Sequence, residues 1–327
     1  MKIKRIGICG YGNLGKGIES EIVNFPDMAL VGIFTRRDPQ TLHPALSSVD
    51  VMSINVMKQY QGEIDVMIMA GGSRRDLPKQ VPEAAKYFNT VDSFDTHKKI
   101  WPYFNSVDII AEDSKHTSIV SGGWDPGWDS VQRVVADAIL PNGETNTFYG
   151  DGVSQGHSNA IRRIKGVKNA IQYTTPIEEP LRRSRDGEIM QLESTDMHIR
   201  RCFVVLEEGA DKEEVYRKIV TMKNYFEGYK TEVSFITEEE MEKSHNRMYH
   251  AGDLIHNAIT GNGNKQQIQY LLRQDSNPEF TASTLLALAR ACYRMNEAKQ
   301  YGAKTLLHIP PMLLSARSEE ELLKKFM

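Results

Sequence analysis

Three glycines near the start of the chain have the spacing of a nucleotide-binding turn. Gly10, Gly12 and Gly15 follow an apolar segment at 4–9, which reads as a buried strand, and precede a helical pattern at 16–24. Gly10 permits a tight turn, Gly12 leaves no side chain in the way of a pyrophosphate, and Gly15 lets the helix pack closely on the strand. The free N–H groups and positive dipole end of such a helix attract phosphates. The spacing therefore predicts a dinucleotide site, whereas a plain surface turn would leave the three glycines unexplained.

The end of the second predicted strand, 29–34, indicates which dinucleotide is bound. NAD-specific sites usually carry Asp or Glu at this point, which bonds the ribose 2′-hydroxyl. Here the strand is followed by Thr35, Arg36 and Arg37. A hydroxyl and two guanidinium groups suit a 2′-phosphate, which a carboxylate would repel. We therefore expect NADP(H) rather than NAD(H), with two solvated arginines as the alternative interpretation.

The composition argues against several classes of function. The 327 residues carry a net charge of −3, which gives no electrostatic reason to expect nucleic acid or a membrane surface as a partner. No apolar run reaches the roughly 18 residues of a membrane span, and the first predicted strand leaves no room for a secretory signal. Cys9, Cys202 and Cys292 lie far apart in apolar contexts. We expect reduced, buried thiols in a cytoplasmic protein without a metal site.

The order of predicted elements divides the chain into two domains. Strands and helices alternate over 1–121, which is typical of a parallel, doubly wound α/β sheet. From 122 to about 274 several extended segments follow with few helices, which favours an α+β domain with a mixed or antiparallel sheet. A long apolar helix at 281–300 can pack back on the first domain. We therefore expect a Rossmann-type dinucleotide-binding domain over 1–121 and about 275–327, and a substrate-binding and dimerisation domain over about 122–274.

Polar residues follow the predicted strands of the first domain, where ligands of such sheets bind. Asp95 and Asp125 each come shortly after a strand. A carboxylate at such a position can hold an amine and help remove its proton. Most aspartates at strand ends are turn formers or helix caps, which is the alternative interpretation of both.

An ordered set of segments resembles the meso-diaminopimelate dehydrogenase family. The matching segments are Gly-Tyr-Gly-Asn-Leu-Gly at 10–15, Phe-Thr-Arg-Arg at 34–37, Val-Asp-Ser-Phe-Asp-Thr-His at 91–97, Trp-Asp-Pro-Gly at 124–127, the loop at 150–158, Gln-Tyr-Thr at 172–174 and Asn-Pro-Glu-Phe-Thr-Ala-Ser at 277–283. The resemblance spans nearly the whole chain. It implies an NADP-dependent, dimeric, cytoplasmic enzyme of lysine biosynthesis, which interconverts meso-2,6-diaminopimelate with L-2-amino-6-oxopimelate and ammonia.

The resemblance also implies roles for single residues. It implies that Asp95 and Asp125 are the catalytic groups and hold the reacting D-amino group. The other substrate-binding residues that it implies are Trp124, Tyr149, Gln155, Gly156, Thr174, Arg200, His250 and Asn277. The expected cofactor-binding residues are Gly10, Tyr11, Gly12, Asn13, Leu14, Thr35, Arg36, Arg37, Gly71, Gly72, Ser73, Asp92 and Phe94.

The chain departs from the family pattern at several places, which leaves its substrate scope open. Tyr149 stands where the family usually has Trp, and Arg74 and Arg75 follow the segment 71–73. The loop before His250 reads Arg-Met-Tyr instead of Gly-Met-Pro. Two alternatives remain: an NADP-dependent D-amino acid dehydrogenase of broader or different scope, and a non-catalytic NADPH-binding protein. A sugar oxidoreductase is disfavoured, because the first domain has no Lys-Pro dipeptide at a strand end.

Overall fold

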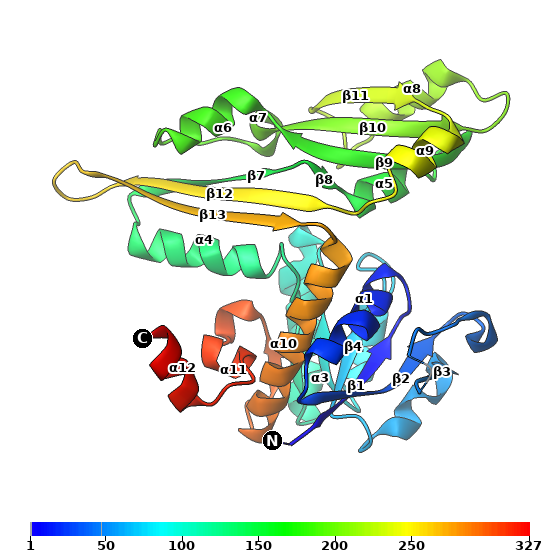
Figure 1. The fold of residues 1–327 in the computed structure, drawn as a ribbon, viewed down its shortest axis with the longest axis vertical. Coiled ribbons are helices and arrows are strands. Elements are labelled where there is room, and N and C mark those ends of the chain that lie inside the picture. Colours follow the sequence, from blue (N-terminus) through cyan, green and yellow to red (C-terminus); the bar gives the residue numbers. More distant parts are fainter. Residues whose placement is uncertain (1, 47) are drawn as a thin grey trace. The chain divides into compact units, whose positions relative to one another are not determined.

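The computed structural model describes residues 2–46 and 48–327, which form two compact units. The first unit comprises Met1–Val131 and Pro278–Met327, and the second comprises Gln132–Asn277 (Figure 1). The chain passes from one unit to the other within the helices α4 (Trp128–Ile139) and α10 (Asn277–Glu297). The division near residue 131 therefore falls inside a helix, after the domain boundary that the sequence pattern suggested at 121.

A seven-stranded parallel sheet forms the centre of the first unit. Its order is β14-β6-β5-β4-β1-β2-β3. The strands are β1 (Lys4–Cys9), β2 (Met28–Thr35), β3 (Asp50–Ser53), β4 (Val66–Met69), β5 (Asn89–Asp92), β6 (Thr117–Ile119) and β14 (Gly302–Lys304). The strand order changes direction at β1, between β4 and β2, and doubly wound folds bind ligands at such a switch point. The predicted Rossmann-type fold is confirmed.

Both faces of this sheet are buried because its strands place apolar side chains alternately on each face. In β4, Ile68 packs in one core with Leu285 of α10, whereas Met67 packs in another with Val107 of α3 (Ile100–Asp113). The other helices of this unit are α1 (Asn13–Glu21), η1 (Ile22–Asn24), η2 (Pro39–Thr41), η3 (Ile54–Tyr60), α2 (Leu77–Ala84), η4 (His97–Lys99), η5 (Leu306–His308), α11 (Pro311–Leu314) and α12 (Glu319–Phe326). The cores hold the strand ends, and therefore the loops that follow them, in fixed positions.

A buried cluster of charges fixes the C-terminal part of the chain to the first unit. Arg290 of α10 donates hydrogen bonds to both carboxylate oxygens of Asp27, at 2.7 and 2.6 Å, and Lys4 of β1 donates at 3.0 Å. Burial alone would raise the pKa of Asp27, but the bonds from Arg290 and Lys4 hold it well below its usual range. Because each charge is paired, the cluster joins segments far apart in sequence without leaving an isolated buried ion.

Two sheets form the second unit. The four-stranded sheet contains β8 (Gly152–Val153), β9 (Val167–Pro176), β10 (His198–Leu206) and β11 (Lys230–Phe235). The three-stranded sheet contains β7 (Gly143–Tyr149), β12 (His250–Ile259) and β13 (Lys265–Gln274). The pair β10–β11 is parallel and the remaining pairs are antiparallel. The helices are α5 (Gln155–Ile161), α6 (Glu178–Arg185), α7 (Ser194–Met197), α8 (Lys212–Val220) and α9 (Glu238–Ser244). The predicted α+β character and mixed sheet are confirmed.

All three cysteines are free and buried. Burial raises the pKa of the Cys9 and Cys202 thiols to about 12 each. Both groups are therefore neutral thiols at physiological pH, and the thiolate is the reactive form. Within the described residues, no helix combines the length and apolar character that crossing a membrane requires.

Candidate cofactor and substrate sites

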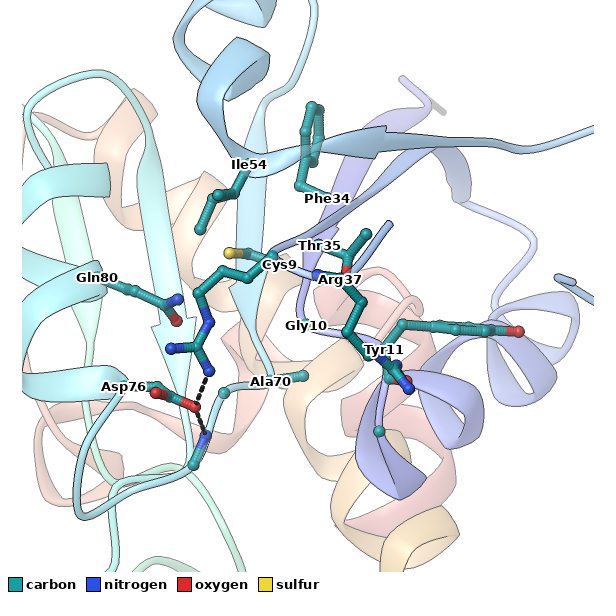
Figure 2. A pocket seen from close by; sticks show the side chains of 14 residues that line it. Cys9, Gly10, Tyr11, Phe34, Thr35, Arg37, Ile54, Ala70, Asp76 and Gln80 are labelled. Atoms are coloured by element: carbon teal, nitrogen blue, oxygen red, sulfur yellow. Dashed lines mark hydrogen bonds and ion pairs between the residues drawn. The ribbon is translucent and has the colours of Figure 1, made fainter. Parts of the chain in front are cut away.

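A cavity of about 280 Å³ lies at the switch point of the parallel sheet (Figure 2). It joins the glycine turn after β1, the end of β2 and the glycine pair after β4. Its lining residues are Cys9, Gly10, Tyr11, Gly12, Phe34, Thr35, Arg36, Arg37, Ile54, Ala70, Gly71, Gly72, Asp76 and Gln80. Most of the residues expected to bind the cofactor therefore line one cavity, although they come from three separate loops.

Each of the three glycines of the turn has a different structural role. Gly10 has a φ of +105°, and a Cβ there would lie 2.9 Å from the carbonyl carbon of Ala70. A Cβ on Gly15 would lie 2.2 Å from the carbonyl oxygen of Gly10. A Cβ on Gly12 would meet no atom within 4 Å, so Gly12 keeps space open for a ligand. Gly12 also caps α1 without a side-chain acceptor, so no side chain of the N-cap residue competes with a phosphate at this helix end.

The residues after β2 present cationic donors to the same cavity. The Thr35 hydroxyl accepts a hydrogen bond from the backbone N–H of Arg37 at 3.1 Å, which shapes the turn. The Arg37 guanidinium donates to the carbonyl oxygen of Tyr11, and the Arg36 guanidinium pairs with Asp76 at 2.8 Å. Two guanidinium groups beside an uncapped helix end form a donor set that fits a dinucleotide with a 2′-phosphate.

Asp92 connects the loops that follow β5 and β6. Its side chain is fully buried, and one of its carboxylate oxygens accepts from the backbone N–H of Phe94 at 2.8 Å and of Ser121 at 3.1 Å. The other oxygen accepts from the hydroxyl of Tyr103 at 2.7 Å. Burial raises the pKa of Asp92 to about 6, although all three hydrogen bonds favour its ionised form. The Asp92 side chain thus braces two loops through bonds from three protein donors.

Those two loops carry Asp95 and Asp125. The Asp95 side chain is exposed, and its backbone N–H donates to the hydroxyl of Ser73 at 2.9 Å. Asp125 is half-buried and joined to Pro126 by a cis peptide bond. The preceding Trp124 is buried, and its indole N–H donates to a carboxylate oxygen of Asp129 at 3.0 Å. Both aspartates therefore stand on loops at the carboxyl ends of neighbouring strands.

Five of the residues expected to bind the cofactor lie outside the set that lines the cavity. They are Asn13, Leu14, Ser73, Asp92 and Phe94. Phe94 is buried and stacks on Tyr103 at 4.1 Å between ring centroids. These assignments stay predictions.

In the second unit, Arg200 is a buried cation on β10. Arg200 on β10 faces Thr174 on β9, and its Nη1 donates to the Thr174 hydroxyl at 2.5 Å. The ring of Tyr229 lies 4.1 Å from the guanidinium carbon. The residue is 8% exposed and its Nε has no hydrogen-bond partner. Within 2–46 and 48–327 no carboxylate forms an ion pair with it. Burial accordingly lowers the pKa of Arg200. This group is prepared to bind a carboxylate from a ligand.

His250, Tyr149 and Gly152 lie close together. A Cβ on Gly152 would lie 2.1 Å from Nδ1 of His250, so only glycine allows the imidazole to occupy this position. The Tyr149 ring meets His250 edge-on, with ring centroids 6.2 Å apart. Arg133 donates to the Tyr149 hydroxyl at 2.8 Å, a bond that a Trp at this position could not accept. Burial lowers the pKa of His250, which favours the neutral imidazole.

Met248 connects the remaining residues expected to bind substrate. The Met248 carbonyl accepts from the backbone N–H of Asn277 at 3.0 Å, and its sulfur lies 3.9 Å from the Gln155 amide nitrogen. Gln155 and Gly156 begin α5, where Ser154 caps the helix. Gly156 is exposed, with open space around the position of a Cβ. The structure thus brings Gln155 and Asn277 to the loop that precedes His250.

Two residues that sequence reasoning missed belong to these sites. Asp76 lines the cofactor cavity, and its position after the glycine pair and before a helix could have indicated this from the sequence. Tyr229 covers Arg200. No sequence signal marked Tyr229, because its position depends on the parallel pairing of β10 with β11.

Comparisons with known proteins agree with this description. A family model described as the diaminopimelic acid dehydrogenase C-terminal domain matches residues 123–276. The chain is 52% identical over 323 residues to a meso-diaminopimelate D-dehydrogenase from Ureibacillus thermosphaericus, with 99% of each chain covered. A C. glutamicum DAP dehydrogenase in complex with DAP is 40% identical with a TM-score of 0.95, and 100% of both chains is covered. An engineered D-amino acid dehydrogenase bound to NADP⁺ is 39% identical with a TM-score of 0.91, again over 100% of both chains.

Proposed function

The chain belongs to the meso-diaminopimelate D-dehydrogenase family, and from this premise we propose that it interconverts meso-2,6-diaminopimelate and L-2-amino-6-oxopimelate with NADP(H). In the oxidative direction the D-centre loses its amino group as ammonia, and in the reverse direction ammonia is incorporated. This reaction belongs to lysine biosynthesis.

The observation that carries the proposal is the buried guanidinium of Arg200. An unpaired buried cation is costly, and an incoming carboxylate removes that cost. The Nε that lacks a partner and the bond from Nη1 to Thr174 leave Arg200 ready for a ligand with one carboxylate. We assign Arg200 and Thr174 to the L-centre of the substrate. His250 and Asn277 add neutral polar groups to the same end.

The cofactor assignment rests on the cavity of the first unit. Its uncapped helix end and open Gly12 suit a pyrophosphate, and Arg36 and Arg37 suit the 2′-phosphate. Bound NADP⁺ supplies the acceptor for the hydride that leaves the D-carbon.

We assign Asp95 and Asp125 to the amino group of the D-centre. An ammonium group must lose a proton before hydride can leave its carbon, and a carboxylate can hold the amine and accept that proton. Water then attacks the substrate imine and ammonia departs. The backbone N–H groups at Gln155 and Gly156, at the start of α5, are assigned to the carboxylate of the same centre.

This arrangement accounts for selectivity between stereoisomers. An L,L- or D,D-isomer places one amino and carboxylate pair in the wrong geometry, so buried donors remain unpaired and binding is lost.

Tyr149 and its bond from Arg133 are the feature that favours a second candidate, a D-amino acid dehydrogenase of wider scope. The Tyr side chain occupies less volume than the Trp that is usual in the family.

NADPH formation, measured with the three diaminopimelate stereoisomers and several simple D-amino acids, tests the proposal. Each substrate is supplied with NADP⁺ and, separately, with NAD⁺. We expect turnover of the meso isomer with NADP⁺. Turnover of simple D-amino acids at comparable kcat/KM supports the second candidate. NADPH binding without turnover of any substrate contradicts both and supports a binding protein.

We also propose a cytoplasmic homodimer. Apolar side chains are exposed at Val134, Val135 and Ile139 on α4 and at Tyr270 and Leu271 on β13. A partner surface would remove them from water. Three buried free thiols are compatible with a reducing compartment. Analytical ultracentrifugation tests the dimer, and a monomer at micromolar concentration would contradict it.

A further inference from the structure

Asp76 is the one carboxylate among the residues described as lining the cofactor cavity. One of its oxygens forms an ion pair with the Arg36 guanidinium at 2.8 Å, and the same oxygen accepts a hydrogen bond from the backbone N–H of Gly72 at 3.0 Å (Figure 2, dashed lines). The cation that is expected to receive the 2′-phosphate is therefore already bound to an acid of the protein.

The carboxylate of Asp76 is held in position. The backbone N–H of Asp76 donates to the Gly72 carbonyl at 2.8 Å, which closes a turn after β4. A Cβ on Gly71 would lie 2.9 Å from that of Asp76 and 2.7 Å from the Gln80 side chain. The Asp76 side chain is 17% exposed, whereas that of Arg36 is 62% exposed. The arginine can move with the ligand, but the acid stays in the wall of the cavity.

An anion that binds to Arg36 must then approach this fixed carboxylate. The 2′-phosphate carries up to two negative charges, and like charges at short range repel. NADH has no phosphate at this point, so Asp76 does not affect it in the same way. We propose that Asp76 determines cofactor affinity and selectivity by competing with the 2′-phosphate of NADP(H) for Arg36, an inference that rests on the proposed function. It weakens NADPH binding relative to what the two arginines alone would give.

The test is to measure dissociation constants for NADPH and NADH by titration calorimetry with wild type, Asp76→Asn, Arg36→Gln and the double variant. Asn keeps an oxygen that can accept from Gly72 but removes the charge. We expect D76N to bind NADPH about threefold or more tightly and NADH unchanged, since an exposed ion pair has a modest energy. In the R36Q background D76N should increase NADPH affinity less, because the guanidinium for which Asp76 and the phosphate compete is absent. Raising the salt concentration should reduce the difference.

Asp38→Asn is the matched control. Asp38 lies close to Arg36 in sequence, but its carboxylate accepts from the Gln40 backbone N–H and it does not line the cavity. D38N should therefore leave the ratio of NADPH to NADH affinity unchanged. If D76N leaves NADPH affinity unchanged, weakens it or tightens NADH equally, the inference is overturned while the proposed function stands. A wild-type chain that binds no NADPH overturns both.

Discussion

Thr174 and Arg200 face each other across the antiparallel strands β9 and β10, and their side chains are joined by a hydrogen bond of 2.5 Å. Neither residue is more than 8% exposed. The threonine thereby fixes one nitrogen of a guanidinium whose Nε is left without a partner. The pair forms a prepared carboxylate receptor inside the second unit.

Replacing Arg200 by Met should abolish the binding of the distal carboxylate. We expect kcat/KM for meso-diaminopimelate to fall by about 30-fold or more, since truncating one side of a buried charge pair has a large cost. Affinity for NADPH should not change. Arg201→Met is the control, because Arg201 is exposed and pairs with Glu232 at 3.2 Å. Equal losses in both variants would argue against the assignment of Arg200.

Asp95→Asn and Asp125→Asn should lower kcat while NADPH binding is kept. Loss of a positioned carboxylate typically reduces a proton-transfer rate by about 100-fold or more. Steady-state kinetics combined with NADPH titration separates the two effects. Asp113→Asn, at the exposed end of α3, serves as a control for the change of charge. Variants with wild-type kcat would remove these aspartates from the mechanism.

Gly12→Ala and Gly15→Ala should separate binding from folding. A methyl group at Gly12 enters open space, so the free energy of unfolding should change by less than about 1 kcal/mol, while NADPH affinity falls. A methyl group at Gly15 meets the Gly10 carbonyl at 2.2 Å and should lower the free energy of unfolding more than G12A does. Urea denaturation and NADPH titration of both variants check this. Gly261→Ala, where the methyl group is also unopposed, should alter neither quantity.

Asp92 should make stability depend on pH in an unusual direction. Its pKa is raised from 3.8 to about 6 in the folded chain, so the folded state binds the proton more tightly than the unfolded state. The resulting stabilisation is full below the unfolded pKa and is lost as pH rises through about 6, with a magnitude of about 3 kcal/mol. Asn cannot titrate, so the free energy of unfolding of Asp92→Asn should lack this pH-dependent component. Denaturation of the wild type and of the variant, measured against pH, checks this.

Tyr103→Phe gives the complementary measurement. It deletes the hydroxyl that favours the ionised form of Asp92, so the pKa should rise further and the loss of stability should move to higher pH. An unchanged profile in both variants would show that the Asp92 carboxyl does not titrate differently on folding.

The sequence predicted the parts of the structure that depend on local geometry. The strand at 4–9 and the glycine turn follow from spacing alone, and the first domain's parallel sheet follows from the alternation of its elements. The bond between Thr174 and Arg200 could not be predicted in this way, since it requires the register of β9 against β10. The ion pair between Arg36 and Asp76 joins two loops across the switch point, and no local pattern encodes it.

The sequence pattern did not predict the hairpin of β12 and β13, for a different reason. Strand β13 is mostly exposed and β12 is almost continuously buried, so neither alternates with a period of two. The turn Gly261-Asn262-Gly263 between them was a usable signal, because such residues favour positive φ, and Gly263 has a φ of +75°.

The three buried cysteines also give the protein a set of built-in probes. Cys9 lies in the wall of the cofactor cavity, Cys202 lies two residues after Arg200 on β10, and Cys292 lies in the core contributed by α10. A thiol-reactive dye can modify each of them only after local opening, so its labelling rate measures the opening equilibrium at that point. Mass spectrometry of labelled peptides would then map protection by NADPH and by substrate separately, without any engineered label.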